Sequence, residues 1–113
     1  MLATYDGDAA PLYAQLNSVP ADIIALDFAS SATLAEVIVS TGASKELGLG
    51  LVDGRSPLLE DPQQVAADVR AVLRRYPFEQ IHLLPSCGLG SLPRDYARAK
   101  LAHLAAIHRH ISA

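Results

Sequence analysis

The sequence predicts an α/β fold in which four βα units share one parallel sheet. Four short apolar runs recur along the chain, and each leads into a stretch with the spacing of an amphipathic helix. The apolar residues at 22–27 are continuous rather than alternating, which is typical of a strand buried on both faces. The chain has 113 residues, and no linker rich in Gly, Ser or Pro divides it. We therefore expect a single domain over residues 1–113.

The first two units are predicted from their strands and helix starts. A strand at 2–5 leads to a helix that begins near Asp8, whose face carries Leu12 and Leu16 four residues apart. The strand at 22–27 leads to a helix capped by two serines. Its predicted caps, apolar stripe and C-cap are Ser30, Ser31, Leu34, Val37, Ile38, Thr41 and Gly42.

The last two units carry stronger helix signals. The strand at 47–52 has two glycines that remove side chains from one face, and Asp61-Pro62-Gln63-Gln64 predicts a helix start in which Gln64 bonds back to the cap. Pro77 is expected to end that helix before a strand at 80–84. Residues expected to face the core from the two helices, the second spanning about 94–110, are Val65, Val69, Val72, Leu73, Tyr96, Leu101, Leu104, Ile107 and Ile111.

Composition excludes several classes of protein. Nine Lys plus Arg against twelve Asp plus Glu give a net charge of −3, and Trp is absent, so nucleic acid is not an expected partner. No apolar run is long enough to span a membrane, and one cysteine forms no internal disulfide. The start of the chain carries no export signal, so a cytoplasmic location is expected.

Polar or nucleophilic residues follow each of the four predicted strands. The carboxyl ends of parallel strands meet at one edge of a sheet, where the βα loops build active sites. We therefore expect one shallow cleft there, although such Asp and Ser residues also cap helices and form turns. The candidates are Asp6, Asp27, Asp53, Arg55, Ser56 and Cys87.

Two of these candidates have specific chemistry. Arg55 offers a fork of donors that suits a carboxylate ligand, or it is a surface residue without such a role. Cys87 is a nucleophile, a metal ligand, or a small buried apolar residue. No histidine is predicted beside it, because His82 lies within a strand and the others belong to the last helix. The glycines at 48 and 50 lie inside a strand and do not form a phosphate-binding loop.

The motifs at these strand ends resemble those of cobalamin-independent methionine synthase and its relatives, which are (βα)8 barrels. Residues 47–57 are similar to the seventh strand and loop of that family, and 83–90 with 100–104 resemble its eighth strand and closing helix. Residues 22–28 and 4–8 fall at its sixth strand and at the end of its fifth. The resemblance implies half of a TIM (βα)8 barrel.

The resemblance implies methyl transfer from methyltetrahydrofolate, as substrate, to a homocysteine-like thiol on zinc. Cys87 matches the last zinc ligand and Asp27 stands at the position of a glutamate ligand, while Ala3 and Tyr5 replace His and Cys. The same motifs also resemble the family's amino-terminal barrel, which lacks the metal. Two hypotheses follow: a methyltransferase that is incomplete on its own, with substrate bound by Asp6, Asp53, Arg55 and Ser56, or a non-catalytic relic or binding subunit that keeps the fold and a small-molecule ligand without zinc.

A half-barrel leaves two sheet edges and an inner face open. We therefore expect self-association as a homodimer, or a second half-barrel chain that supplies the missing strands. The residues expected on the open inner face are Ile24, Leu26, Leu49, Leu51 and Leu83.

Overall fold

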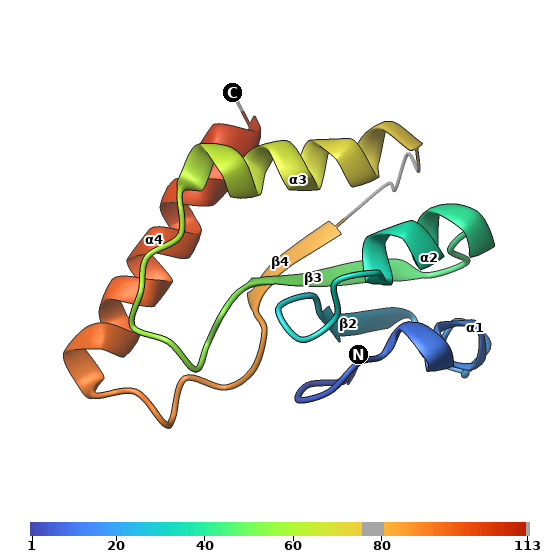
Figure 1. Ribbon diagram of the computed structural model, residues 1–113, viewed down its shortest axis with the longest axis horizontal. Helices are drawn as coiled ribbons and strands as arrows, with labels where there is room; N and C mark the ends of the chain where they lie inside the picture. Colours follow the sequence, from blue (N-terminus) through green and yellow to red (C-terminus); the bar gives the residue numbers. More distant parts are fainter. Residues whose placement is uncertain (76–80, 113) are drawn as a thin grey trace.

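Four parallel strands form one sheet in chain order, as the sequence predicts (Figure 1). The computed structural model describes residues 1–75 and 81–112. The strands are β1 (Leu2–Ala3), β2 (Ile23–Asp27), β3 (Glu46–Val52) and β4 (Ile81–Pro85). Register pairs Ile24 with Leu47 and Leu49 with Leu83, so the carboxyl ends of the strands lie at one edge. The α/β class and the half-barrel order are confirmed.

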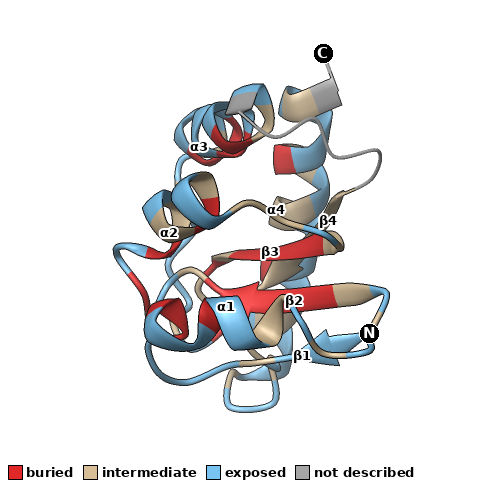
Figure 2. Cartoon of the chain, turned by 90° about the vertical axis from the view of Figure 1, so that its right-hand side faces the viewer, coloured by how far each residue is buried: buried red, intermediate tan, exposed pale blue. Residues whose placement is uncertain are grey.

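Helical segments follow each strand, so the four βα units are also confirmed. Their bounds are η1 (Ala10–Leu12), α1 (Tyr13–Leu16), α2 (Leu34–Thr41), α3 (Pro62–Arg75) and α4 (Arg94–Ser112). Strands β2 and β3 are the most buried part of the chain (Figure 2). No helix among the described residues is long and apolar enough to cross a bilayer.

The two faces of the sheet differ in side-chain size. Ile24, Leu26 and Leu49 are buried in one cluster with residues of α1, α2 and α3, so they face the helices. On the opposite face, a Cβ added at Gly48 would lie 2.8 Å from the side chains of both Ala25 and Leu84. Successive residues of a strand point to opposite faces. The inner face therefore has small residues on β2 and β3, namely Ala25, Gly48 and Gly50, and larger side chains, His82 and Leu84, on β4.

The prediction of which residues lie on the inner face was wrong, because the large apolar residues of the strands point toward the helices. Ile24, Leu26, Leu49, Leu51 and Leu83 all pack in the clusters beneath the helices. A continuous apolar run does not show which parity of residues faces the helices. The alternating glycines of β3 do show it, because a glycine beneath a helix would leave a cavity.

The first unit differs from its prediction in the residues that face the core. Leu12 is exposed and Tyr13 is fully buried, with its hydroxyl donating to the carbonyl of Gly42 at 2.8 Å. The short η1 segment precedes α1 and turns Leu12 outward. Asp8 accepts a hydrogen bond from the Ala10 N–H at 3.0 Å, so it does bond at the start of this segment.

The later helices keep their predicted apolar faces with three corrections. Helix α2 begins after Thr33, and neither predicted serine cap bonds its first turn. Asp61 accepts from the Gln63 N–H at 2.9 Å as a cap, but Gln64 donates forward to Asp68 instead of bonding back. In addition, Thr41, Tyr96 and Leu101 are exposed. Pro77 and Gln80 lie outside the described residues.

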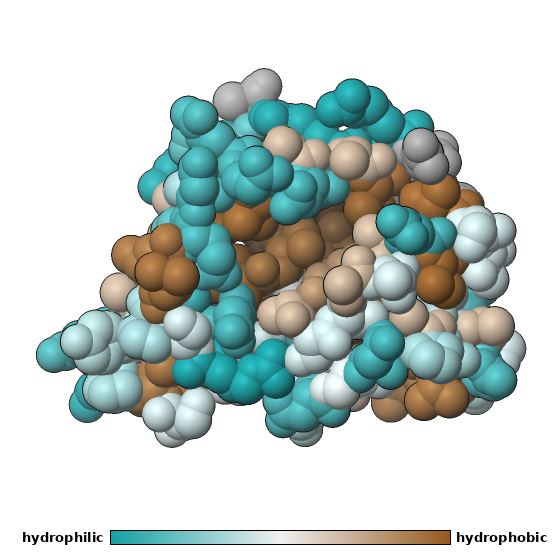
Figure 3. All heavy atoms as spheres, viewed as in Figure 1, coloured by the Kyte–Doolittle hydropathy of each residue, from teal (hydrophilic) through white to brown (hydrophobic). Residues whose placement is uncertain are grey.

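The helices leave part of the outer face hollow. An apolar groove of about 430 Å³ lies between α2 and α3, lined mainly by Ala35, Val39, Ala71 and Val72 (Figure 3). Small side chains at these positions do not fill the space between the two helices. Gly42 ends α2 at a φ of 89°, a left-handed conformation that favours glycine.

Candidate functional site

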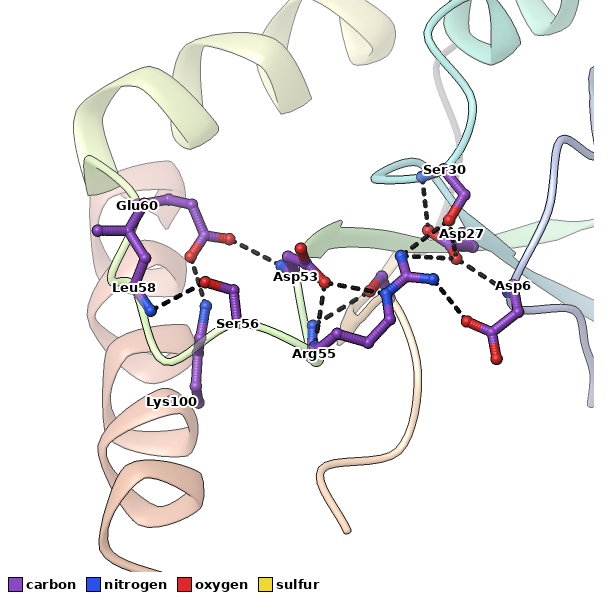
Figure 4. Close-up of polar contacts among 11 residues, drawn as sticks. Asp6, Asp27, Ser30, Asp53, Arg55, Ser56, Leu58, Glu60 and Lys100 are labelled. Carbon is purple, nitrogen blue, oxygen red and sulfur yellow. Dashed lines mark hydrogen bonds and ion pairs between the residues drawn. The ribbon is translucent and has the colours of Figure 1, made fainter. Parts of the chain in front are cut away.

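The structure brings four of the predicted site residues together at the carboxyl ends of the strands. Arg55, in the loop after β3, lies at the centre (Figure 4). Its guanidinium contacts Asp6 at 2.5 Å, Asp53 at 3.3 Å and Asp27 at 3.4 Å. The guanidinium also donates to the hydroxyl of Ser30 at 2.8 Å. Three carboxylates thus surround one cation, which leaves a net negative charge at this face.

Asp27 is the buried member of this group. Only 1% of the residue is exposed. A carboxylate buried to this extent requires hydrogen-bond or ion-pair partners within the protein. Its Oδ2 accepts from the Asp6 N–H at 3.1 Å, the Ser30 hydroxyl at 2.8 Å and Arg55. Its Oδ1 accepts from the Ser30 N–H at 3.0 Å. Asp27 therefore joins the ends of β1, β2 and β3.

The turn after β1 places Asp6 at the open side of the site. Asp6 has a φ of 62° and Gly7 a φ of 125°, so the backbone reverses here in the left-handed region. This turn aims the Asp6 N–H at Asp27, while its own side chain remains 64% exposed beside Arg55. Asp6 is the carboxylate of this group most accessible to a ligand.

Hydrogen bonds shift the pKa values of two groups in the Arg55 loop. The backbone N–H of Arg55 donates to Asp53 at 3.0 Å and lowers the pKa of that carboxyl, aided by the Arg55 side chain and by Lys100. The hydrogen bond to Asp53, and the charges of Asp27, Asp53 and Asp6, raise the pKa of Arg55. Both shifts favour the charged forms, so the loop is held as an ion-paired unit.

A second aspartate outside the Arg55 group is also stabilised as a carboxylate. The Ser31 hydroxyl and the Ala10 N–H donate to Asp8 and lower its pKa. This contact links the loop after β1 to the loop after β2. Ser31, predicted as a helix cap, thus has a different partner.

Lys100 and Glu60 form a part of the site that the sequence analysis missed. The Lys100 ammonium lies 2.6 Å from Glu60 Oε1, with its side chain 0% exposed and that of Glu60 24% exposed. The other carboxylate oxygen of Glu60 accepts from the Asp53 N–H at 2.8 Å. Helix α4 therefore anchors the loop that carries Arg55. The sequence did contain a signal that Lys100 is buried. It lies three residues before His103 and seven before Ile107, which places it on the inward face of α4.

Ser56 and Cys87 lie outside the Arg55 network. The Ser56 hydroxyl accepts from the Leu58 N–H at 3.2 Å, which is a turn contact. Cys87 lies against the loop of β3, because a Cβ added at Gly54 would be 2.7 Å from its carbonyl oxygen and 3.1 Å from its sulfur. The neighbouring Ser86 is buried and accepts from the Gly54 N–H at 3.1 Å.

Cys87 also lines a small pocket at the inner face. The pocket has a volume of about 240 Å³, and its lining includes Tyr5, Ala25, Leu84 and Cys87. Residues of β1 and β4 line this one pocket although two strands separate them, so the sheet curves around it. The pocket is mostly apolar and lies beside the charged group around Arg55.

The residues at this face do not fit a zinc ion. Asp27 accepts four hydrogen bonds from the protein, and the positively charged Arg55 guanidinium lies 3.4 Å from its Oδ2. A catalytic zinc site takes three protein ligands. No group of three or more potential His, Cys, Asp or Glu ligands occurs among residues 1–75 and 81–112.

Comparison with known proteins identifies similar chains. Residues 7–109 match the family model described as "Cobalamin-independent synthase, Catalytic domain". A methionine synthase from Saccharolobus solfataricus is 38% identical over 69 residues, which are 61% of this chain and 21% of the relative. A methionine synthase from Thermococcus kodakarensis is 38% identical over 60 residues, which are 53% of this chain and 18% of the relative. The chain thus spans about a fifth of these relatives.

A solved structure supports the same fold. The B12-independent methionine synthase from Shewanella sp. W3-18-1, in complex with selenomethionine, superimposes with a TM-score of 0.71 at 24% identity. The match covers 89% of this chain and 29% of that chain. The superposition shows that the four βα units follow the architecture of one part of a larger protein.

Proposed function

We propose that this chain, which belongs to the cobalamin-independent synthase catalytic-domain family, is a small-molecule binding unit. In this proposal the chain does not itself carry out zinc-dependent methyl transfer. Its ligand site is the carboxyl-end face formed by Asp6, Asp27, Asp53 and Arg55 with the adjoining pocket. This is the second of the two hypotheses that the sequence supports.

The observation that carries this proposal is the pairing of Asp27 with Arg55. Oδ2 of Asp27 accepts three bonds from the protein, one of them from Arg55, and Oδ1 accepts one from the Ser30 N–H, so a metal ion at Asp27 would compete with four protein donors. Ala3 and Tyr5, at the positions where the family resemblance implies His and Cys, supply no replacement ligand. Cys87 is then left without other metal ligands.

The charge of the face defines the ligand class. Arg55 already contacts three carboxylates and the Ser30 hydroxyl, which occupy four of its five donors and offset its charge, so it is poorly placed for the carboxylate ligand that the sequence suggested. The surplus negative charge and the exposed Asp6 favour a ligand with an ammonium group. The apolar pocket beside it suits an uncharged side chain. A small amino acid such as methionine or homocysteine has both features.

Calorimetric titration tests this proposal. With EDTA present, L-methionine and L-homocysteine should bind, and N-acetyl-L-methionine, which lacks the ammonium group, should bind at least about tenfold more weakly, the value of one charged hydrogen bond. Asp6→Asn should cause a similar loss, while Asp22→Asn, an exposed aspartate before β2, serves as the matched control. Equal affinity for L-methionine and N-acetyl-L-methionine would contradict the assigned ligand class.

A second candidate function is methyl transfer to a thiol with a completing partner. It is supported by Cys87, which lies in the same pocket as Tyr5 at the carboxyl ends. Metal analysis after dialysis separates the two candidates. Near-stoichiometric zinc that disappears in Cys87→Ser, together with transfer from methyltetrahydrofolate to homocysteine, would favour the transferase and overturn the first proposal.

A further inference from the structure

We propose that Lys100 is a positioning residue of the carboxyl-end face, which holds the loop of residues 53–60 in the conformation that presents Arg55 to the carboxylates. Lys100 lies on α4 and not at the end of a strand, and it acts on this loop through Glu60. The loop follows β3 and ends just before α3. The effect of Lys100 on ligand affinity rests on the proposed function, whereas its effect on the loop does not.

A continuous series of bonds runs from Lys100 to Arg55 (Figure 4). The Lys100 ammonium donates to Oε1 of Glu60 at 2.6 Å, and the other carboxylate oxygen of Glu60 accepts from the Asp53 N–H at 2.8 Å. Oδ1 of Asp53 then accepts from the Arg55 N–H at 3.0 Å and from the Arg55 Nε at 3.3 Å. The place of the Lys100 ammonium therefore bears on where the guanidinium lies.

The bond between Glu60 and Asp53 closes the loop on itself, because these residues lie at its two ends. On the side of β4 the loop is attached by the Gly54 N–H, which donates to the buried Ser86 hydroxyl at 3.1 Å. On the side of α4 it is attached by the ion pair of Glu60 with Lys100. The closed loop is thus fixed to two elements, and removal of the Lys100 ammonium takes away its ion pair to α4.

Stability alone does not explain a lysine at this position. The Lys100 side chain is 0% exposed and that of Glu60 24% exposed, so both charges have lost water. Apolar side chains of similar size are often as stable as a buried ion pair, because desolvation offsets the attraction of the charges. An ammonium provides what an apolar side chain lacks, since it fixes one oxygen of Glu60 and leaves the other directed at the Asp53 N–H. The pair therefore specifies where the loop lies.

The charge of Lys100 acts on Asp53 as well. The hydrogen bond from the Arg55 N–H is the main cause of the lowered pKa of Asp53, and the positive charge of Lys100 adds to it. Lys100 thus acts on Asp53 in two ways, at its N–H through Glu60 and at its carboxylate through the charge. The charged carboxylate is the stronger acceptor for the two bonds from Arg55.

Hydrogen exchange measured by NMR on the ligand-free chain tests the effect on the loop. In Lys100→Met the bond from the Asp53 N–H to Glu60 should still form but open more often, because α4 no longer holds the carboxylate. We expect the Asp53 N–H to exchange about three- to tenfold faster than in the unmodified chain.

Two control variants on α4 should leave this rate unchanged. Arg98→Met removes an exposed positive charge, and Ile107→Val removes a buried methyl group at a cost in stability comparable to that of Lys100→Met. An Asp53 N–H that exchanges at the same rate in Lys100→Met and in the unmodified chain, or that accelerates equally in Ile107→Val, would overturn the proposal.

Calorimetric titration with L-methionine, with EDTA present, tests the effect on the site. Lys100→Met and Glu60→Gln interrupt the same series of bonds, so each should weaken binding by about three- to tenfold. The double variant should bind no more weakly than the single variants. Glu60→Gln leaves a buried ammonium unpaired and is therefore the less stable single variant. Losses of affinity that follow stability, or no loss in either variant, would contradict a positioning role.

The unmodified chain provides a test that needs no variant to fold. Coupling between the site and the loop is reciprocal, so saturating L-methionine should slow exchange of the Asp53 N–H by about three- to tenfold. A rate that saturating ligand leaves unchanged would refute the coupling. If the unmodified chain does not bind L-methionine, the proposed function fails, and the ligand-free exchange of the variants still decides the role of Lys100.

Discussion

The buried pair of Lys100 and Glu60 makes an asymmetric prediction about stability. Glu60→Gln leaves the ammonium of Lys100, whose side chain is 0% exposed, without its counter-ion. Breaking a buried pair in this way costs about 3–5 kcal/mol. We expect a loss of about 3 kcal/mol, because the new amide oxygen still accepts one bond, from Lys100 or from the Asp53 N–H.

Lys100→Met should be less harmful than Glu60→Gln. The Glu60 side chain is 24% exposed and keeps its bond from the Asp53 N–H, so water solvates the carboxylate when the ammonium is removed. The methionine side chain also packs in the space of the lysine stem. We expect a loss of about 1 kcal/mol for this variant, and a double variant more stable than Glu60→Gln alone.

Urea unfolding followed by circular dichroism, at pH 7 and one fixed protein concentration, measures these differences. Glu36→Gln makes the same chemical change at an exposed position of α2 and should alter stability by about 0.5 kcal/mol or less. A Lys100→Met variant as unstable as Glu60→Gln, or a double variant less stable than both single variants, would refute this account of the pair.

Two further predictions concern the strand ends. Gly50→Ala should destabilise the fold by about 1–3 kcal/mol, because its Cβ would lie 2.6 Å from the carbonyl oxygen of Leu26, whereas Gly88→Ala, with nothing within 4 Å, should be near neutral in thermal melts. The lowered pKa of Asp53 means that its stabilising contribution is present above its unfolded pKa of about 3.9 and is lost as pH falls through the lower folded value. Asp53→Asn should therefore flatten the dependence of unfolding free energy on pH below about 4, and an unchanged slope would contradict the role of its bonds from Arg55.

The fold was largely predictable because each βα unit carries its own local signals. Apolar runs placed β2 and β3 within one residue of their observed starts, and Asp61 and Pro62 marked the start of α3. The side-chain faces were harder to predict. A four-residue spacing favoured Leu12 as a core residue, but the intervening η1 segment rotated the chain and buried Tyr13 instead.

The sheet topology predicted that the site residues lie close together, but it did not predict which of them form ion pairs and hydrogen bonds with one another. Parallel strands bring Asp6, Asp27 and Asp53 to one edge whatever their roles. Arg55 pairs with all three carboxylates, which lie 49, 28 and 2 residues away from it in the sequence. These pairs depend on how the side chains are placed in the folded protein. Local patterns carry no information about such contacts.

The positive charge of Arg55 determines the structural role of the Asp27 carboxylate. A carboxylate buried as deeply as that of Asp27 needs partners in the protein to compensate for the loss of water. Arg55 supplies a fixed cation with five donors, and Ser30 and the Asp6 N–H satisfy the remaining acceptor positions. A zinc ion in the same place would have to displace these bonds and approach a guanidinium. The position that resembles a metal ligand in the family is therefore better understood here as the anchor of an ion-paired network at the ends of the strands.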